Sequence, residues 1–507
     1  MKFINKIVNK VTQKRLLQIE AFKNNPFEFQ KTLLQELITK AKNTRFGKEH
    51  HFPEIISNFN IASFQESIPV RNYSELKPYI DKVRGGENNV LWPSPIKWFA
   101  VSSGTTSDKS KFIPVSKEAL EDNHFRGGKD IIAVYSSQYE DAKLVKSKSL
   151  VIGGSQQISS FENNLYYGDL SAVIIDNLPI WSHLLRTPSK NVALLPKWEE
   201  KLEKMAEQTI NENVTSITGV PSWTLVLLKR ILEKTDKKNI SQVWPEFELF
   251  IHGGVSFAPY RNVFEKILPS NTRYLETYNA SEGFFALQDD LTRDDLLLIL
   301  DIGIFYEFIP LENLYDKNPK VYTVKDVRKD INYAMVITTN SGLWRYLIGD
   351  TVRFTSLKPH KIKITGRIRH FINAFGEELI IENAEKALKE TSERTHTQIK
   401  EFTAAPIYIS DTSTGAHEWL IEFSEKPKNI SEFAKILDEE LKKTNTDYAS
   451  KRYKDLTLRM PVIHLAKDGL FYEWLKEKGK LGGQNKVPRL ANNRMYIDEL
   501  LDMNSKQ

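Results

Sequence analysis

The stretch WFAVSSGTTSDKSKFIPVS, residues 98–116, places an apolar run on each side of a segment rich in hydroxyl groups. The two runs, residues 98–101 and 112–115, predict the strands of a β-hairpin. Ser116 then stands where it can cap a helix that begins near Lys117. We therefore expect a hairpin that carries the hydroxyl-rich segment at its tip, with a helix behind it.

The expected hairpin tip has the composition of a phosphate-binding loop. Its residues include Ser102, Ser103, Gly104, Thr105, Thr106, Lys109 and Lys111. Small residues let backbone N–H groups approach an anion closely, hydroxyl groups add donors, and lysines add positive charge. The segment has neither the G-x-x-x-x-G-K-[ST] spacing of a Walker loop nor the glycines of a dinucleotide loop. Taken alone, a solvated hairpin tip remains an equal alternative.

The rest of the chain has the length and the pattern of a multidomain α/β protein. With 507 residues, of which 40% are hydrophobic, two or three domains are expected. Short β-rich runs, residues 149–153 and 172–175, alternate with helical runs, residues 196–210 and 223–234. This alternation predicts an α/β domain with largely parallel sheets.

Charge, cysteine content and hydropathy argue against several classes of protein. The formal net charge of +6 comes from 71 basic and 65 acidic residues spread along the chain, so no basic stripe favours nucleic acid. The absence of cysteine excludes disulfides, thiolate metal sites and cysteine nucleophiles. No apolar run approaches the roughly 18 residues of a membrane span. We therefore expect no nucleic-acid partner, no stable membrane insertion and a cytoplasmic location.

Further sequence elements follow the hairpin in an informative order. They are Gly253 with Gly254 after an apolar run, the segment YNASE at 278–282, Gly349 with Asp350 at a tight turn, Gly366 with Arg367, and the loop KLGGQNK that ends at Lys486. This order, across nearly the full chain, resembles the adenylate-forming (acyl-AMP) ligases. Within that superfamily, the sequence is most similar to the plant auxin-responsive Gretchen Hagen acyl-acid amido synthetases and their bacterial relatives.

The resemblance implies an α/β fold in two parts. A large N-terminal adenylate-forming domain, residues 1–366, would have mixed β-sheets flanked by helices and would bind ATP and the acyl acid. A smaller, mobile C-terminal α+β lid domain, residues 367–507, would follow a hinge near residues 366–370, with Arg369 at the hinge position. For this small domain the periodicity predicts helices at 382–402 and 431–445 and strands at 405–409, 419–423 and 456–464.

The same resemblance implies which residues bind ATP and Mg²⁺. The nucleotide-binding set is Ser102, Ser103, Gly104, Thr105, Thr106, Lys109, Gly253, Gly254, Tyr278, Asn279, Ser281, Asp350 and Arg367. Within it, the Tyr278 ring would stack on adenine, the Ser281 hydroxyl would reach the α-phosphate, and Asp350 would accept bonds from the ribose diol. Glu282 would hold Mg²⁺ against phosphate oxygens.

Catalytic and acyl-pocket residues are implied in the same way. The catalytic set is Lys486, Thr106 and Glu282. Lys486 lies on a glycine-flexible loop, from which an ammonium would neutralise phosphate charge during adenylation. The acyl pocket would be lined by Val220, Trp223 and His252.

A few positions depart from the family pattern. Asn279 replaces a glycine, which asparagine tolerates because it enters left-handed conformations readily. In WRYLIGD, residues 344–350, Arg345 matches the first arginine of the family pattern, whereas Leu347 replaces the second. Arg369 stands where aspartate or lysine is common. Residues 305–310 resemble a family segment and alternate like a half-buried strand.

The resemblance implies an enzyme that adenylates a carboxylic acid with ATP and Mg²⁺. An amine, such as an amino acid, would then take the acyl group to form an amide. Two alternatives stay open: a ligase that delivers the acyl group to coenzyme A, and a nucleotide-binding protein without turnover. The departures at Leu347 and Arg369 are the support for the second alternative.

Overall fold

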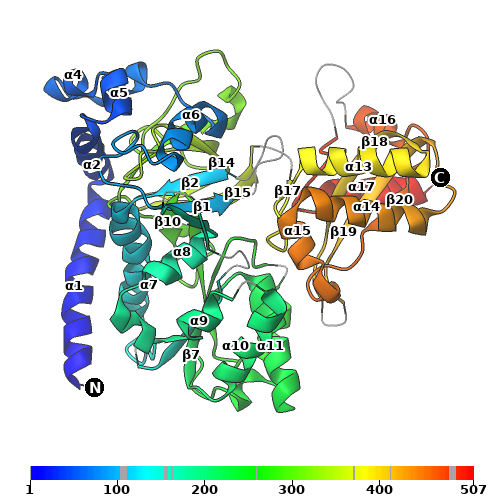
Figure 1. Ribbon diagram of the computed structural model, residues 1–507, viewed down its shortest axis with the longest axis horizontal. Coiled ribbons are helices and arrows are strands. Elements are labelled where there is room, and N and C mark those ends of the chain that lie inside the picture. Colours follow the sequence, from blue (N-terminus) through cyan, green and yellow to red (C-terminus); the bar gives the residue numbers. More distant parts are fainter. Residues whose placement is uncertain are drawn as a thin grey trace.

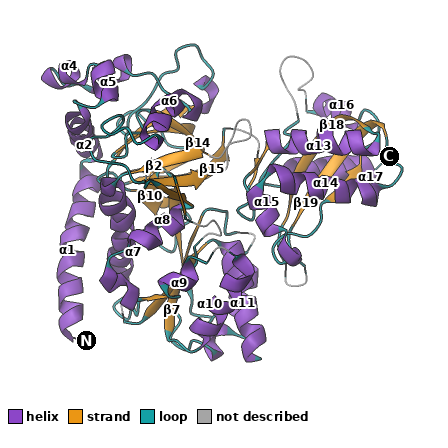
Figure 2. Cartoon of the chain, in the orientation of Figure 1, coloured by secondary structure: helices purple, strands orange, loops and turns teal. Residues whose placement is uncertain are grey.

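The computed structural model describes residues 2–102, 111–144, 146–153, 158–161, 164–195, 197–258, 260–368, 371–410, 413–478 and 487–506. Figure 1 shows a larger lobe, coloured blue to yellow-green, and a smaller C-terminal lobe, coloured yellow to red. Helices cover the outside of both lobes and strands lie between them (Figure 2). This architecture confirms the predicted α/β fold, with a large N-terminal part and a smaller C-terminal part. None of the helices in the described ranges is long and apolar enough to cross a membrane.

The larger lobe is built on a mixed sheet that has eleven strands within the described residues, in the order β12-β13-β14-β15-β11-β10-β9-β8-β7-β3-β6. Its parallel half is β3 (Lys148–Val151), β6 (Arg186–Thr187), β7 (Val214–Gly219), β8 (Leu249–Gly253) and β9 (Arg273–Ala280). Its antiparallel half is β10 (Gly283–Leu287), β11 (Leu296–Leu298), β12 (Ile304–Pro310), β13 (Asn332–Thr339), β14 (Tyr346–Leu357) and β15 (His360–Arg367). The predicted parallel sheet is therefore right for one half only.

The hairpin predicted from residues 98–116 is confirmed. Strand β1 (Trp98–Ser102) pairs antiparallel with β2 (Lys111–Val115), from Trp98 opposite Val115 to Ser102 opposite Lys111. β5 (Tyr166–Gly168) and β4 (Ser159–Ser160) complete this second sheet. Residues 103–110, the tip of the hairpin, lie outside the described residues.

Ser116 fastens the hairpin to the main sheet. Its Oγ accepts a hydrogen bond from the Ala119 N–H at 2.9 Å, which is the predicted cap, and donates to the Asn340 carbonyl at 2.7 Å. The helix behind it begins with a π-helical turn, Ala119–His124, and continues as α7 (Phe125–Gln138). The base of the expected phosphate loop is thereby fixed relative to β13 and its following turn.

Helices form the N-terminal part and the covering layers of the larger lobe. They are α1 (Lys2–Asn24), α2 (Pro26–Ala41), α3 (Arg45–Glu49), α4 (Phe52–Ser57), α5 (Ile61–Ser67), α6 (Tyr73–Arg84), α8 (Leu170–Asn177), α9 (Lys190–Ala193), α10 (Trp198–Ile210), α11 (Pro221–Thr235) and α12 (Arg261–Ile267). α10 and α11 match the predicted helical runs closely. Short 3₁₀ helices lie at Ile180–Leu184, Ile240–Gln242 and Leu311–Asn313.

Two segments of the larger lobe were predicted with the wrong structure. Residues 172–175 were expected to be extended but lie in α8, because the Asp169 side chain accepts a bond from the Ala172 N–H at 2.8 Å and starts a helix. Residues 305–310 were expected to be half-buried, yet every residue of β12 is buried. β12 is covered on both faces, since α2 packs against it and its other face lies in the core.

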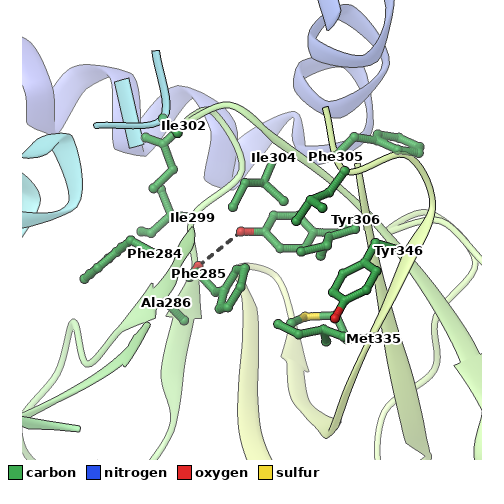
Figure 3. Packing of buried hydrophobic residues seen from close by; sticks show 14 of the residues in the cluster. Phe284, Phe285, Ala286, Ile299, Ile302, Ile304, Phe305, Tyr306, Met335 and Tyr346 are labelled. Carbon is green, nitrogen blue, oxygen red and sulfur yellow. Dashed lines mark hydrogen bonds between the residues drawn. The ribbon is translucent and has the colours of Figure 1, made fainter. Parts of the chain in front are cut away.

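A dense core lies beneath the antiparallel half of the sheet. Figure 3 shows the Phe285 side chain of β10 and the Tyr306 side chain of β12 pointing toward each other, with Tyr346 and Met335 close by; the two rings have centroids 6.4 Å apart. The Tyr306 hydroxyl donates to the Phe285 carbonyl at 3.5 Å. This packing holds β10 in place, and with it the turn that joins β9 to β10.

The smaller lobe has its own three-stranded sheet, β18-β19-β20, in the described residues. Its elements are β16 (Phe371–Ile372), β17 (Leu379–Ile380), α13 (Ile381–Thr395), β18 (Gln398–Ile407), β19 (Ala416–Glu425), α14 (Ile430–Thr444), α15 (Thr446–Lys451), a 3₁₀ helix (Tyr453–Asp455), β20 (Val462–Leu465), α16 (Leu470–Glu477) and α17 (Met495–Ser505). The strand predicted at 456–464 begins only at Val462. The sequence reading missed α16 and α17.

Candidate active site

A cavity of about 310 Å³ lies where the two lobes meet. From the larger lobe it is lined by the β9–β10 turn, the start of α11 and the end of β8. From the smaller lobe it is lined by residues 373–378 and by α15. Two buried hydrogen bonds join the lobes beside it: Tyr260 donates to the Ala374 carbonyl at 2.6 Å and Ser222 to the Phe375 carbonyl at 2.9 Å.

The β9–β10 turn carries the polar centre of the cavity. Asn279, Ser281 and Glu282, all predicted site residues, line the cavity together with Lys111 from β2. Burial raises the pKa of Glu282 to about 7, and the nearby Lys111 ammonium offsets part of this effect. Burial also lowers the pKa of Lys111. The cavity therefore holds a carboxylate whose charge is only partly compensated, which is a suitable ligand for a cation.

Tyr278, Asp350 and Arg367 form one hydrogen-bonded chain. The Tyr278 hydroxyl donates to Asp350 Oδ2 at 2.7 Å, and Arg367 Nε donates to Asp350 Oδ1 at 2.7 Å. Arg367 also forms an ion pair with Glu378, which follows the crossover between the lobes. The Tyr278 ring packs on Phe285, with ring centroids 4.8 Å apart. Three residues predicted separately from the sequence are therefore in direct contact.

Asp350 is presented by a β-bulge and not by the tight turn that the sequence predicts. β14 runs unbroken from Tyr346 to Leu357. Opposite β13, its register shifts so that residues 348–350 face the single residue Met335. Gly349 has φ 99, a conformation that glycine enters at little cost. The bulge turns Asp350 toward Tyr278, as bulges beside sites often do.

An apolar part of the cavity wall contains two of the three predicted acyl-pocket residues. Val220 caps α11 and Trp223 lies in its first turn, and both line the cavity with Gly254. His252, the third, stacks on Phe257 with centroids 4.1 Å apart, and burial lowers its pKa to about 3. His252 is therefore a neutral core residue beside the pocket and does not line it.

Gly253 is needed for the close pairing of β8 with β9 more than for the cavity. An added Cβ there would lie 2.4 Å from the Thr277 carbonyl oxygen of the neighbouring strand β9. We predict that Gly253→Ala lowers the free energy of unfolding by about 1–3 kcal/mol, measured by urea denaturation, since the backbone must shift. The matched control is Gly128→Ala on α7, where an added Cβ meets nothing within 4 Å and helix propensity favours alanine. Equal stability of the two variants would contradict this role.

Arg345, the match to the family's first arginine, lies away from the cavity. Its Nε donates to Glu307 Oε2 at 2.9 Å, and its Nη1 donates to the carbonyls of Gln65 and Ile68. Arg345 is 3% exposed and Glu307 is fully buried. This pair holds the N-terminal helical segment against β12 and β14.

Several predicted site residues lie outside the described residues. They are Ser103, Gly104, Thr105, Thr106, Lys109, Arg369 and Lys486. Ser102 is described as the last residue of β1, paired with Lys111. The roles given to these residues stay predictions.

The structure adds cavity residues to which the sequence analysis gave no role. They include Asn373, Gly376, Glu378, Asp447 and Lys451. Lys111, which was expected to bring charge to the phosphate loop, also lines the cavity. Asp447 and Lys451 have the spacing of a solvated helical pair, and nothing in the sequence distinguishes them from surface charges.

Comparisons with known proteins agree with this geometry. The GH3 family N-terminal domain matches residues 15–273, the GH3 family central domain residues 297–367 and the GH3 family C-terminal domain residues 382–495. The 4-substituted benzoates-glutamate ligase GH3.12 of Arabidopsis thaliana is 24% identical over 93% of this chain and 94% of its own length. The indole-3-acetic acid-amido synthetase GH3.4 of the same plant is 22% identical over 94% of this chain and 92% of its own.

Solved structures share the fold. A GH3.15 acyl acid amido synthetase, determined in complex with 2,4-DB, superposes with a TM-score of 0.63 at 18% identity, covering 97% of this chain and 96% of its own. A 2-hydroxyisobutyryl-CoA ligase superposes with a TM-score of 0.56 at 12% identity, covering 94% and 91%. The predicted family and the predicted enzyme class, a ligase, are confirmed. Because the N-terminal family model alone matches more than half of the sequence, the chain belongs to the GH3 family.

Proposed function

We propose that the chain is an ATP-dependent acyl-acid amido synthetase, which adenylates a carboxylic acid and transfers the acyl group to an amino acid. The observation that carries this proposal is the hydrogen-bonded chain of Tyr278, Asp350 and Arg367, whose last member lines the cavity together with Glu282. The names of the two relatives, a 4-substituted benzoates-glutamate ligase and an indole-3-acetic acid-amido synthetase, support the same chemistry.

The residues of the cavity fit a nucleotide and a divalent cation. Lys111 and Arg367 bring positive charge to the wall, and Asp350 carries carboxylate oxygens suited to a ribose diol. In the described part of the chain, no three His, Asp or Glu side chains gather to hold a metal alone. Glu282 would therefore share Mg²⁺ with phosphate oxygens, the usual arrangement for this ion. Neutralisation of phosphate charge is the chemistry that the bound ion supplies.

The first chemical step needs charge neutralisation and alignment more than a covalent nucleophile. A carboxylate oxygen of the acid attacks the α-phosphorus of ATP, the bond from this phosphorus to the bridging oxygen breaks, and pyrophosphate leaves with its electron pair. The Lys111 ammonium, on β2, neutralises the negative charge that develops on the phosphate oxygens, while Asp350 and Arg367 position the nucleotide. Thr106 and Lys486 are proposed to add donors from the two loops.

The second step forms the amide. The uncharged amine nitrogen attacks the acyl carbonyl carbon, the bond to the phosphate oxygen breaks, and AMP leaves with the electron pair while the nitrogen loses a proton. Val220 and Trp223 supply the apolar wall against which the acyl group lies. We also propose the domain division at 366/367, with the lid lobe moving about residues 366–370 between the two steps.

Exchange of radiolabelled pyrophosphate into ATP tests the first step. With a panel of aromatic and aliphatic acids, we expect exchange that depends on both an acid and Mg²⁺. Adding amino acids, coenzyme A and hydroxylamine in parallel then identifies the acceptor. An amide product supports the proposal, a thioester product supports the coenzyme A alternative, and ATP binding without exchange supports a protein that lost turnover. The cytoplasmic location and the absence of a nucleic-acid partner stay predictions.

A further inference from the structure

Helix α15 places two oppositely charged side chains in the cavity wall, on the side of the smaller lobe. Asp447 and Lys451 are four residues apart, so they share one face of the helix, and both line the cavity. Neither takes part in the chemistry assigned above to the β9–β10 turn, β14 and β15. The pair therefore needs an explanation of its own.

The position of α15 is fixed by buried polar contacts. The Asn445 side chain caps the helix by accepting from the Tyr448 N–H at 2.8 Å and donates to the carbonyls of Glu377 and Glu378, at 3.0 and 3.2 Å. The Tyr448 hydroxyl donates to Asp438 on α14 at 2.7 Å. The helix is thus tied to the same segment, residues 373–378, that forms the neighbouring cavity wall.

Lys451 reaches across to the larger lobe. Its Nζ lies 3.4 Å from the centre of the Trp223 ring, in the apolar part of the cavity, and the side chain is 5% exposed. Its contact with an aromatic face is weaker compensation than a carboxylate would give. Within the described residues, no carboxylate lies within 4.0 Å of this ammonium. Glu377, a buried acid next to the cavity residue Gly376, already has a partner, because its Oε1 lies 2.8 Å from His417 Nε2.

Burial opposes the ionisation of both side chains of the pair. Burial lowers the pKa of Lys451 to about 7, with Asp447, Glu377 and Asp169 acting in the opposite direction. Burial raises the pKa of Asp447 to about 6, and Lys451 offsets part of that. A bound molecule with one negative and one positive group would compensate both.

We propose that Asp447 and Lys451 form the acceptor subsite, where Lys451 binds the carboxylate of an amino acid and Asp447 holds its amino group toward the acyl-adenylate. This inference rests on the proposed amide-forming function and names residues that select its second substrate. An amine without a carboxylate leaves Lys451 uncompensated, so the subsite disfavours it. Trp223, beneath Lys451, joins the acyl wall to this subsite, which places the acceptor beside the acyl group.

The test compares a good amino-acid substrate with its carboxamide, which keeps the amino group and the side chain but lacks the carboxylate charge. Lys451→Met keeps the length of the side chain and removes the ammonium. We expect kcat/KM for the amino acid to fall 10- to 100-fold, the size of one lost charge-assisted contact. The kcat/KM values for the carboxamide and for hydroxylamine are expected to change less than threefold, so the variant loses most of the preference for a substrate with a carboxylate. Lys435→Met, on an exposed position of α14, is the matched control.

Asp447→Asn tests the other half of the pair. Because amino acid and carboxamide share the amino group, both are expected to lose activity to the same extent. Three results for Lys451→Met would overturn the assignment. The variant could lose the same activity with the amino acid and with the carboxamide, or it could lose no activity with either. It could also lose pyrophosphate exchange to the same extent before any amine is added. If Lys451→Met fails to fold, as judged by thermal unfolding, Lys451→Gln gives the same comparison. Absence of acid-dependent exchange in the wild-type protein would instead overturn the proposed function, and the subsite with it.

Discussion

Replacing Glu282 by glutamine is expected to abolish adenylation and, in the ligand-free protein, to increase stability at pH 8. The loss follows because a neutral amide binds Mg²⁺ much more weakly than a carboxylate does, and acid-dependent pyrophosphate exchange should fall by about a hundredfold or more. The gain follows because the pKa of Glu282 is raised by burial to about 7, so its ionisation opposes folding.

The sign and the pH window of this gain are specific. The folded-state pKa lies above the ordinary value of 4.5, so the stability contributed by the protonated group is fully present below pH 4.5 and is lost as pH rises through 7. Denaturation with urea should therefore find wild type and Glu282→Gln equal near pH 4.5, with a difference that grows to at most about 3 kcal/mol above pH 7. Glu265→Gln, at an exposed position, should show neither effect. A variant with wild-type exchange, or with a pH-independent difference, would contradict the role of Glu282.

Arg345→Met is expected to destabilise the protein by about 3–5 kcal/mol, because it removes the charged partner of the fully buried Glu307 carboxylate and leaves only the neutral Gln65 amide bonded to it. It also removes the donor to the carbonyls of Gln65 and Ile68, which hold α5 and the following segment to the sheet. The measurement is the shift of the urea unfolding midpoint.

An exposed ion pair gives the control for this prediction. Arg230 and Glu203 are joined at 2.6 Å with side chains 36% and 40% exposed, so Arg230→Met should cost no more than about 1 kcal/mol. The double variant Arg345→Met with Glu307→Gln should recover part of the loss, since it removes the buried charge that the single variant leaves. If Arg345→Met cost no more than Arg230→Met, the buried pair would not hold the N-terminal segment in place.

Much of the fold follows from local patterns in the sequence. The strands β1 and β2 were predicted because each is an apolar run bounded by small or polar residues. Local patterns failed where another contact decides. Residues 172–175 contain Val173 and two isoleucines, which favour strands, but the Asp169 cap starts a helix there.

The site could be predicted only in part. Tyr278, Asp350 and Arg367 were each assigned to the nucleotide site by resemblance, but their contacts depend on the registers of β14 against β13 and β15. Gly349 was interpreted as part of a tight turn. A β-bulge can also place a glycine at positive φ, so the sequence does not distinguish the two. Lys451 lies 228 residues from Trp223, so its place over that ring depends on how the lobes meet and leaves no trace in the local sequence.

A crystal structure with a non-hydrolysable α,β-methylene analogue of ATP, Mg²⁺ and a carboxylic acid tests most directly whether both lobes enclose one adenylation site. We predict the ribose hydroxyls within hydrogen-bond distance of Asp350, the metal bound by Glu282, and the acid against Val220 and Trp223. A nucleotide bound elsewhere on the chain, with this cavity holding neither nucleotide nor acid, would contradict it.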